Sequence, residues 1–338
     1  MMKHYLFPVF AAGVLLLAGC SSKQYFEPEQ TYDISRQAES SYAGAIIDKS
    51  RDGATLEGGR YIGKEGIGKI TLDEGYRFLS ESSRYVLAGN SSGELKLINK
   101  KSGKIKTIDL HIPVVAASVK NGLIAYILNN NAFGLYRIKD GKKLVENRSE
   151  RTFAIDTRAA SPLFVDTLVV MPMLDGKLII FDINDPETAK VVYLSSEKIF
   201  NNIVYLSRTG DTLVAATPKK LLTLGGDGEF DYRANIAEVV ISGNSIYLFS
   251  KEGEIIKFNI LLDELARKKF KFAQFSAATA LNGNVYALDK QGSLIVLSSD
   301  LTKYKIYDIG EVESPVFISG NRLYKDGNII NLEKLGYE

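Results

Sequence analysis

The sequence contains no tryptophan, one cysteine and two histidines, His4 and His111, in 338 residues. A single cysteine excludes a disulfide framework, and so few cysteines and histidines exclude a structural zinc site or a Cys/His catalytic dyad. A Ser-His-Asp triad would have to use His111, because His4 lies in the leader described below. We expect His111, between Leu110 and Ile112, to have a structural role or to be exposed.

The chain also lacks an excess of charge of either sign. Its 42 lysines and arginines face 40 aspartates and glutamates, which gives a formal net charge of +2. Binding to a phosphate backbone requires a basic excess, so we predict no nucleic-acid partner. No Gly-x-Gly-x-x-Gly motif opens a helix and no phosphate loop is present. A hydrophobic content of 45% with only 8 prolines indicates a folded globular chain.

The longest apolar run is at the N-terminus. Residues 5–17 are mostly apolar, but the run is too short to cross a bilayer of about 30 Å as a stable helix, and it is typical of a signal peptide. The run ends in Leu17-Ala18-Gly19-Cys20, which resembles the bacterial lipoprotein box. The resemblance implies that residues 1–19 are removed by cleavage after Gly19 and that Cys20 is lipidated. The alternatives are an ordinary secretory signal with a chance cysteine, or an N-terminal anchor helix.

The residues after Cys20 predict where the protein resides and how far it stands from the membrane. In enterobacterial lipoproteins, Ser21 rather than Asp after the cysteine implies the outer membrane, and we expect the periplasmic face rather than the cell surface. Residues 20–43 have no sustained apolar period, which predicts a flexible tether. Fully extended, roughly twenty residues reach about 70 Å, so the folded part would stand well away from the membrane.

From residue 44 onward the chain is one repeat. Short runs of Val, Ile, Leu, Tyr and Phe alternate with Gly, Asn, Asp and Ser turns, which predicts many short antiparallel strands. Successive turn glycines are 41, 42, 77 (two units), 39 and 35 residues apart, at Gly93, Gly134, Gly176, Gly253, Gly292 and Gly327. A period near forty with about four strands per unit is typical of a β-propeller blade.

We therefore predict an all-β fold, a β-propeller of four-stranded antiparallel blades over residues 44–338. Seven units start near residues 75, 112, 156, 200, 236, 273 and 310. The last unit shows three strands, so we expect the segment 44–72 to supply its outer strand and close the ring, because an unpaired edge would otherwise be exposed. The alternative is an eighth, short blade, since residues 59–66 resemble residues 320–327.

The repeats resemble those of PQQ-type propellers in three stretches, Ala159-Ala-Ser-Pro162, Leu174-Asp-Gly-Lys177 and Ser102-Gly-Lys-Ile105. Together with the lipoprotein box, they make the chain similar to BamB-type lipoproteins, the propeller subunits of the outer-membrane β-barrel assembly machinery. That family has eight blades. Its repeats commonly end in Gly-Lys-x-x-Trp, whereas this chain has Thr107 and Tyr193 at about those positions.

The resemblance implies a non-enzymatic envelope scaffold that assists assembly and insertion of outer-membrane β-barrel proteins through protein contacts, without a cofactor. Two other functions remain open. A quinoprotein-type propeller would need tryptophan docking motifs and usually a cysteine pair beside the quinone, and this chain lacks both. The sequence hardly tests the other function, that of a surface-exposed or periplasmic lipoprotein that binds sugars or host proteins.

Two segments depart from the repeat. Asp227, Glu229 and Asp231 stand at alternate positions and are a weak candidate for Ca²⁺ ligands. The distal glutamate of a calcium loop is missing, so we expect a strand connection with solvated charges. Residues 259–272 place three leucines at helical spacing beside four basic residues. This segment is either a short amphipathic turn for a partner or a blade connection whose leucines pack on their own blade.

Overall fold

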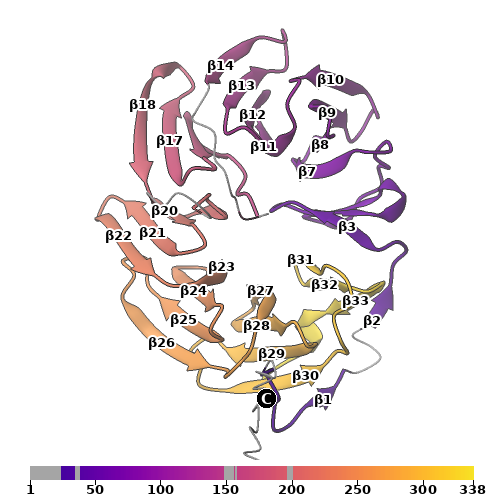
Figure 1. The fold of residues 1–338 in the computed structure, drawn as a ribbon, viewed down its shortest axis with the longest axis vertical. Coiled ribbons are helices and arrows are strands. Elements are labelled where there is room, and N and C mark those ends of the chain that lie inside the picture. Colours follow the sequence, from indigo (N-terminus) through magenta and orange to yellow (C-terminus); the bar gives the residue numbers. More distant parts are fainter. Residues whose placement is uncertain (1–23, 35–38, 148–155, 157, 196–200) are drawn as a thin grey trace, which may run out of the picture.

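The computed structural model describes residues 24–34, 39–147, 156, 158–195 and 201–338. These residues form eight antiparallel sheets arranged as blades around one axis, which is a β-propeller (Figure 1). The predicted all-β propeller of four-stranded blades is confirmed. The predicted count of seven blades was wrong, and the alternative of eight is correct. The predicted cleavage site at Gly19 and lipidated Cys20 lie outside the described residues.

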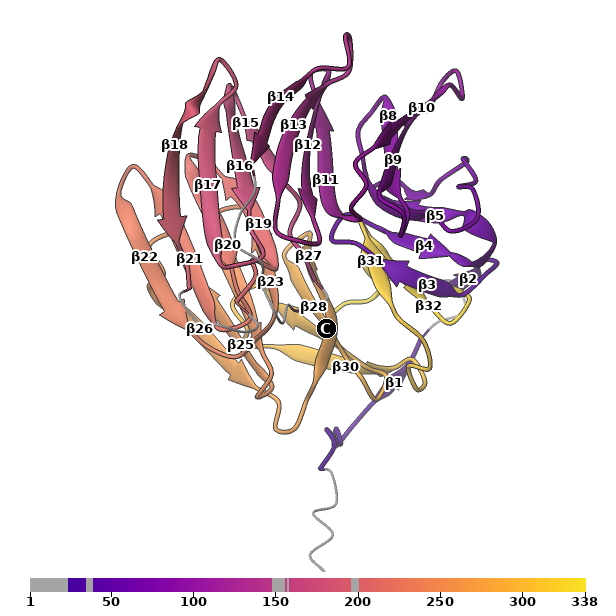
Figure 2. The ribbon, with the colours of Figure 1, turned by 45° about the horizontal axis from the view of Figure 1, so that its top comes forward.

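We number the blades 1 to 8 in chain order, and in each blade the strands follow one another from the axis to the rim (Figures 1 and 2). The inner strands are β3 (Ile46–Lys49), β7 (Arg77–Glu81), β11 (Val114–Lys120), β15 (Leu163–Val165), β19 (Tyr205–Thr209), β23 (Ile236–Ser242), β27 (Phe275–Leu281) and β31 (Phe317–Ser319). The second strands are β4 (Ala54–Leu56), β8 (Tyr85–Gly89), β12 (Leu123–Leu128), β16 (Leu168–Pro172), β20 (Thr212–Ala216), β24 (Ser245–Ser250), β28 (Asn284–Asp289) and β32 (Arg322–Lys325).

The outer half of each blade completes the sheet. The third strands are β5 (Tyr61–Gly63), β9 (Glu94–Asn99), β13 (Phe133–Arg137), β17 (Lys177–Asp182), β21 (Lys220–Gly225), β25 (Glu254–Phe258), β29 (Ser293–Ser298) and β33 (Asn328–Asn331). The outer strands are β6 (Gly66–Ile67), β10 (Ile105–Asp109), β14 (Lys143–Asn147), β18 (Asp185–Tyr193), β22 (Gly228–Arg233), β26 (Glu264–Lys269), β30 (Tyr304–Asp308) and, in blade 8, β2 (Glu39–Ser41).

Burial follows the position of a strand within its blade. Every residue of β12 and of β29 is buried, because both faces of these strands pack against neighbouring blades. Outer strands such as β18 and β26 are mostly exposed and polar. The helices in the described part of the chain are single 3-10 turns, η2 (Glu57–Gly59) and η3 (Leu332–Lys334), and no described helix is long and apolar enough to cross a membrane.

The segment 44–72 does not close the ring as predicted. It forms blade 1, whose strands are only two to four residues long, so the repeat pattern is weak there. The closing strand is β2, which pairs antiparallel with β33 and places Ser40 opposite Ile329. The Tyr42 N–H then donates a hydrogen bond of 2.8 Å to the Gly327 carbonyl. Part of the predicted tether therefore belongs to the propeller.

A fifth strand, β1 (Tyr32–Asp33), extends blade 7. It pairs in parallel with β30, with Tyr32 opposite Tyr307, and lies beside that strand at the lower edge of the ring in Figure 2. We call residues 24–34 the N-terminal segment. This segment and β2 together hold the start of the described chain against blades 7 and 8, so residues 20–43 as a whole cannot act as a flexible tether.

The repeated turn glycines meet two requirements at once. Gly292, between the second and third strands of blade 7, has φ 93°, a conformation that side chains with a Cβ rarely adopt. A Cβ there would also lie 2.0 Å from the carbonyl oxygen of Gly310, on the connection to blade 8. Gly93 of blade 2 is equivalent, with φ 92° and 2.2 Å to the Ile112 nitrogen. The repeat therefore retains glycine where the hairpin touches the next connection.

We expect Gly292→Ala to lower the free energy of unfolding by about 3 kcal/mol, because it combines backbone strain with a backbone clash. Gly283→Ala is the matched control in the same blade, since Gly283 has φ 81° but a Cβ added to it would have no atom within 4 Å. The control should lose only about 1 kcal/mol. Urea denaturation followed by circular dichroism measures both, and equal losses would refute the close-contact explanation.

Candidate functional site

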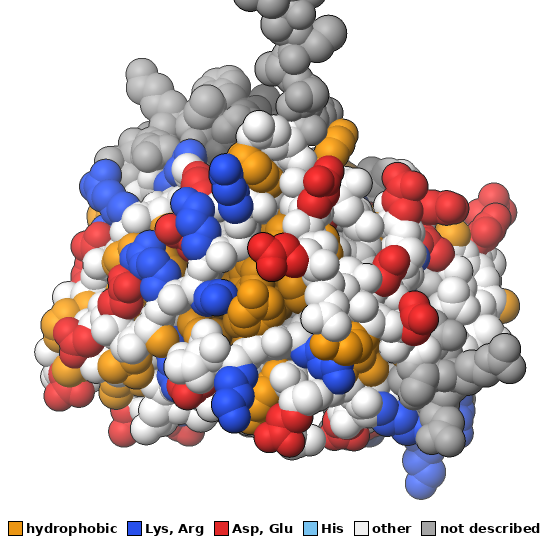
Figure 3. All heavy atoms as spheres, turned by 90° about the horizontal axis from the view of Figure 1, so that it is seen from below, with side chains coloured by type: hydrophobic (Ala, Val, Ile, Leu, Met, Phe, Trp, Pro, Cys, Tyr) orange, Lys and Arg blue, Asp and Glu red, His pale blue; other side chains and the backbone are white. Residues whose placement is uncertain are grey.

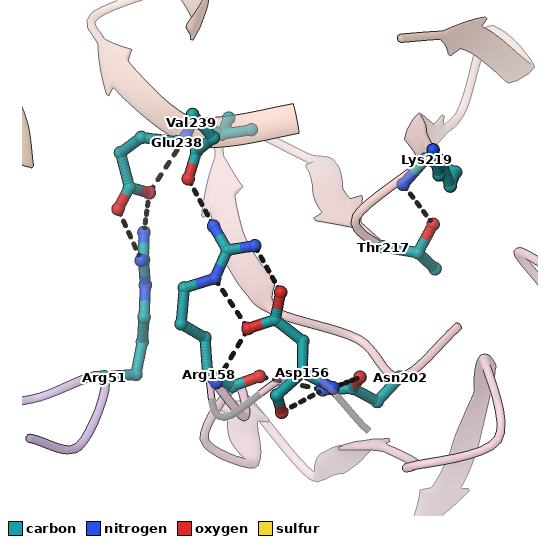
Figure 4. A network of polar contacts seen from close by, with 9 residues as sticks. Arg51, Asp156, Arg158, Asn202, Thr217, Lys219, Glu238 and Val239 are labelled. Atoms are coloured by element: carbon teal, nitrogen blue, oxygen red, sulfur yellow. Dashed lines mark hydrogen bonds and ion pairs between the residues drawn. The ribbon is translucent and has the colours of Figure 1, made fainter. Parts of the chain in front are cut away.

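A network of charged side chains crosses the central channel of the propeller (Figure 4). Arg51 lies in the turn between β3 and β4 of blade 1, and Glu238 lies on the inner strand β23 of blade 6. The two form a bidentate ion pair, with Nη1 2.9 Å from Oε2 and Nη2 2.5 Å from Oε1. Blades 1 and 6 are not neighbours in the ring, so this contact spans the channel.

A second pair joins the same network. Arg158, just before β15, binds Asp156 through Nε to Oδ1 at 2.8 Å and Nη2 to Oδ2 at 2.6 Å, and also donates to the carbonyl of Ala237 beside Glu238. Asn202 lies before β19. Its Oδ1 accepts a hydrogen bond of 2.7 Å from the Asp156 N–H, and its Nδ2 donates one of 2.8 Å to the Arg158 carbonyl. These contacts connect blades 4, 5 and 6 at the channel.

Arg51 and Glu238 form a pair of opposite charges that is partly shielded from solvent. The side chains of Arg51 and Glu238 are 24% and 19% exposed. Burial acts to raise the pKa of Glu238, but the charge and hydrogen bonds of Arg51 outweigh it, so this pKa is lowered. Arg51 also lies 4.9 Å from the centre of the Tyr205 ring, and burial raises the pKa of Tyr205 to about 12.

Lys49 adds a third cation on the blade 1 side of the channel. Its Nζ donates to the Val316 carbonyl of blade 8 at 3.2 Å, and burial lowers its pKa. Arg51 and Arg158 each have a carboxylate partner, so the network is largely neutralised from within. Its chemistry is therefore that of a brace between blades rather than that of a site awaiting an anion.

The predicted calcium ligands do not come together as a metal site. Asp227 lies in the turn between β21 and β22, Glu229 and Asp231 lie on β22, and Asp231 is 3.5 Å from the Nζ of Lys220. Within the ranges that the structure describes, no group of three His, Cys, Asp or Glu side chains could hold a metal ion. His111 is exposed beside Asp109, with its Nδ1 3.0 Å from the carboxylate.

Residues 259–272 form a blade connection and an outer strand rather than a short amphipathic turn. The segment makes a turn and then forms β26, in which exposure alternates with a period of two. Leu262 packs against the core of blades 5 and 6, whereas Leu265 is exposed. Arg267 binds Glu254 of β25 at 3.0 Å and Glu264 at 2.6 Å, so pairing with the neighbouring strand determines this conformation.

The N-terminal segment is held by aromatic contacts that the sequence analysis missed. Phe26 packs edge-on against Phe270 of blade 6, with ring centres 5.8 Å apart, and Phe270 packs edge-on against Tyr304 of blade 7 at 5.3 Å. Farther along, Tyr32 lies 6.3 Å from Tyr307. The aromatic residues of the segment, standing in a polar stretch, were the available signal for this docking.

Lysines surround these aromatic rings at the outer edge between blades 6 and 7. Lys268 lies 4.5 Å from the centre of the Tyr304 ring, and Lys271 lies 4.7 Å from that of Phe272. Figure 3 shows this side of the molecule, where basic side chains gather left of centre around an apolar area. We call the surface formed by Tyr25, Lys268, Lys271, Phe272 and Tyr304 the aromatic-basic edge.

Comparison with known proteins gives relatives of the whole chain. No family model matches. The plasminogen-binding protein PgbB of Helicobacter pylori is 28% identical over 366 aligned positions in one strain and 27% over 369 in another. The alignments cover 94% of this chain and 68% and 67% of the relatives.

Solved structures confirm the resemblance to BamB at the level of the fold. BamB from Moraxella catarrhalis superposes with a TM-score of 0.67 at 16% identity, over 86% of this chain and 98% of that one. Sqt1 of Saccharomyces cerevisiae, at 10% identity, superposes with a TM-score of 0.62 over 85% of this chain and 95% of that one. Propellers with unrelated sequences therefore share this architecture, and fold alone does not determine the partner.

We expect Glu238→Gln to lower the free energy of unfolding by about 2 kcal/mol at neutral pH, because Arg51 loses its charged partner. The pKa of Glu238 is lowered in the folded protein, so its contribution is fully present above the ordinary glutamate pKa and is lost as the pH falls through the lowered value. The difference from the unmodified protein should shrink below about pH 4.3.

Urea denaturation at a series of pH values measures this difference. Glu146→Gln is the control, since Glu146 forms an exposed pair with Lys143 on the rim and should leave the unfolding curve unchanged throughout. A loss of stability in E238Q that is equal at all pH values would show that the charge of Glu238 contributes nothing.

Proposed function

We propose that this chain is a non-enzymatic envelope lipoprotein whose propeller binds another protein. One observation carries the proposal: 94% of the chain aligns with a protein named for binding plasminogen, so the whole propeller rather than a fragment is shared. The BamB-type fold supports the same class of function. In this proposal, lipid on Cys20 anchors the chain in the outer membrane.

The geometry favours the rim and the outer strands as the binding surface. Charge-matched side chains cross the channel, whereas outer strands present their backbone and side chains to solvent. In blade 4, the nine-residue outer strand β18 pairs with β17 and has no further partner in the part of the chain that the structure describes. Val191 and Tyr193 are exposed on this strand. An extended segment of a partner can pair with such an edge.

Plasminogen is the first candidate partner, because of the relatives. The purified full chain should bind immobilised plasminogen saturably in surface plasmon resonance. We expect Tyr193→Ala, which removes a 62% exposed ring, to weaken binding about tenfold. Leu265→Ala is the matched control, since Leu265 is 55% exposed on the outer strand of blade 6 and should leave the affinity unchanged.

The outcomes of this experiment test separately whether plasminogen is the partner and whether β18 is the surface that binds it. No saturable binding by the unmodified protein would eliminate plasminogen as the partner. Unchanged affinity in Tyr193→Ala would leave plasminogen in place and eliminate β18 as the contact. Equal weakening in both variants would point to a general loss of folding, which circular dichroism checks.

Assembly of outer-membrane β-barrels is the second candidate, and the superposition over 98% of BamB favours it. Crosslinking of intact envelopes, followed by capture of the chain and mass spectrometry, should recover the barrel-assembly subunits. The Cys20→Ala variant should lose them. The two candidates also require opposite sides of the membrane, so protease added to intact cells should digest a plasminogen-binding protein and spare an assembly factor.

A further inference from the structure

The docked N-terminal segment limits how far the propeller can stand from its anchor. Phe26 is fixed on blades 6 and 7, and six residue steps separate it from Cys20. Whatever path these residues take, they reach at most about 20 Å. Lipid on Cys20 therefore enters a membrane within that distance of the Phe26 contact. This replaces the reach of about 70 Å expected from an unstructured tether.

The aromatic-basic edge lies at this contact and has the side chains that suit a membrane surface. Tyr25, Phe272 and Tyr304 are 46%, 36% and 44% exposed. Tyrosine rings are enriched at the level of lipid headgroups, and lysines extend their charge to the headgroups while their stems stay on apolar surface. Lys268 and Lys271 contact aromatic rings, and neither has a carboxylate partner among the ion pairs of the described chain.

One of the aromatic residues at the edge has an unusual backbone conformation. Phe272 has φ 68°, in the left-handed region that bulky residues rarely occupy. It lies in the connection from β26 to β27, two residues after Phe270, the ring on which Phe26 packs. Strain of this kind persists where the surrounding structure imposes it, and it occurs often at binding surfaces.

We propose that the aromatic-basic edge binds the headgroup region of the membrane that holds the lipid on Cys20, with anionic phospholipid as its partner. The inference rests on the lipidation of Cys20 in the proposed function. The anchor keeps the edge at high local concentration next to the bilayer, so a weak contact is enough to orient the ring. Blades 6 and 7 then face the membrane, and blades 2 and 3, opposite them in the ring, face away from it.

The absence of tryptophan makes this orientation directly measurable. Phe272→Trp introduces a single reporter at the edge, and Tyr193→Trp introduces one on the outer strand of blade 4. Each full chain is acylated in the producing bacterium and reconstituted in vesicles of phosphatidylethanolamine and phosphatidylglycerol with brominated acyl chains. We expect blue-shifted, several-fold more quenched emission from F272W than from Y193W. Equal quenching in the two proteins would overturn the proposal.

A charge-reversal arm tests the role of the lysines. Lys268→Glu with Lys271→Glu, in the F272W chain, should restore most of the emission. Lys142→Glu with Lys143→Glu, which changes the net charge equally on the rim of blade 3, should leave the quenching as it was. Equal loss of quenching in both double variants would show that net charge alone explains the membrane contact. It would overturn the proposal that the aromatic-basic edge binds the membrane specifically.

The mass of the purified protein separates this inference from the proposed function. A mass without acyl groups would overturn both the anchor and the edge. An acylated protein with an unquenched F272W reporter would overturn the edge alone. Binding of plasminogen or of assembly subunits is measured independently, and its failure would leave the membrane contact unaffected.

Discussion

Closure of the ring by β2 is the constraint on which the rest of the structure depends. Blade 8 supplies three strands of its own, and its fourth comes from Glu39–Ser41 at the other end of the chain. In keeping with this pairing, β1 lies along blade 7, and Phe26 packs on the core of blades 6 and 7. The same pairing that completes the fold thus determines where the N-terminal segment lies on the ring.

Regular features of the fold were predictable from the sequence, and irregular ones were not. Glycine spacing identified blades 2 to 8, although Gly134 lies within β13 rather than in the turn before it. Blade 1 was not counted among the predicted units because its strands of two to four residues leave little apolar pattern. β2 was not predicted because the sequence Glu-Ser-Ser does not favour a strand. It is a strand because its backbone pairs with β33.

The channel network could not have been predicted from the chain alone. Arg51 and Glu238 are 187 positions apart, and their contact depends on the width of an eight-bladed ring. With seven blades the same residues would have faced each other across a different distance. Asp227, Glu229 and Asp231 are exposed at the hairpin of blade 5, and Asp231 lies 3.5 Å from the Nζ of Lys220.

The pairing of β2 with β33 also has a consequence for how the protein is made. A chain emerging N-terminus first presents its closing strand early, about 290 residues before the strand that receives it. Until β33 has been made, β2 has no strand with which to pair, and such long-range pairing is slow. In that interval β2 of one molecule fits the blade 8 of another equally well, so exchange of this strand between copies is a built-in hazard whose frequency rises with concentration.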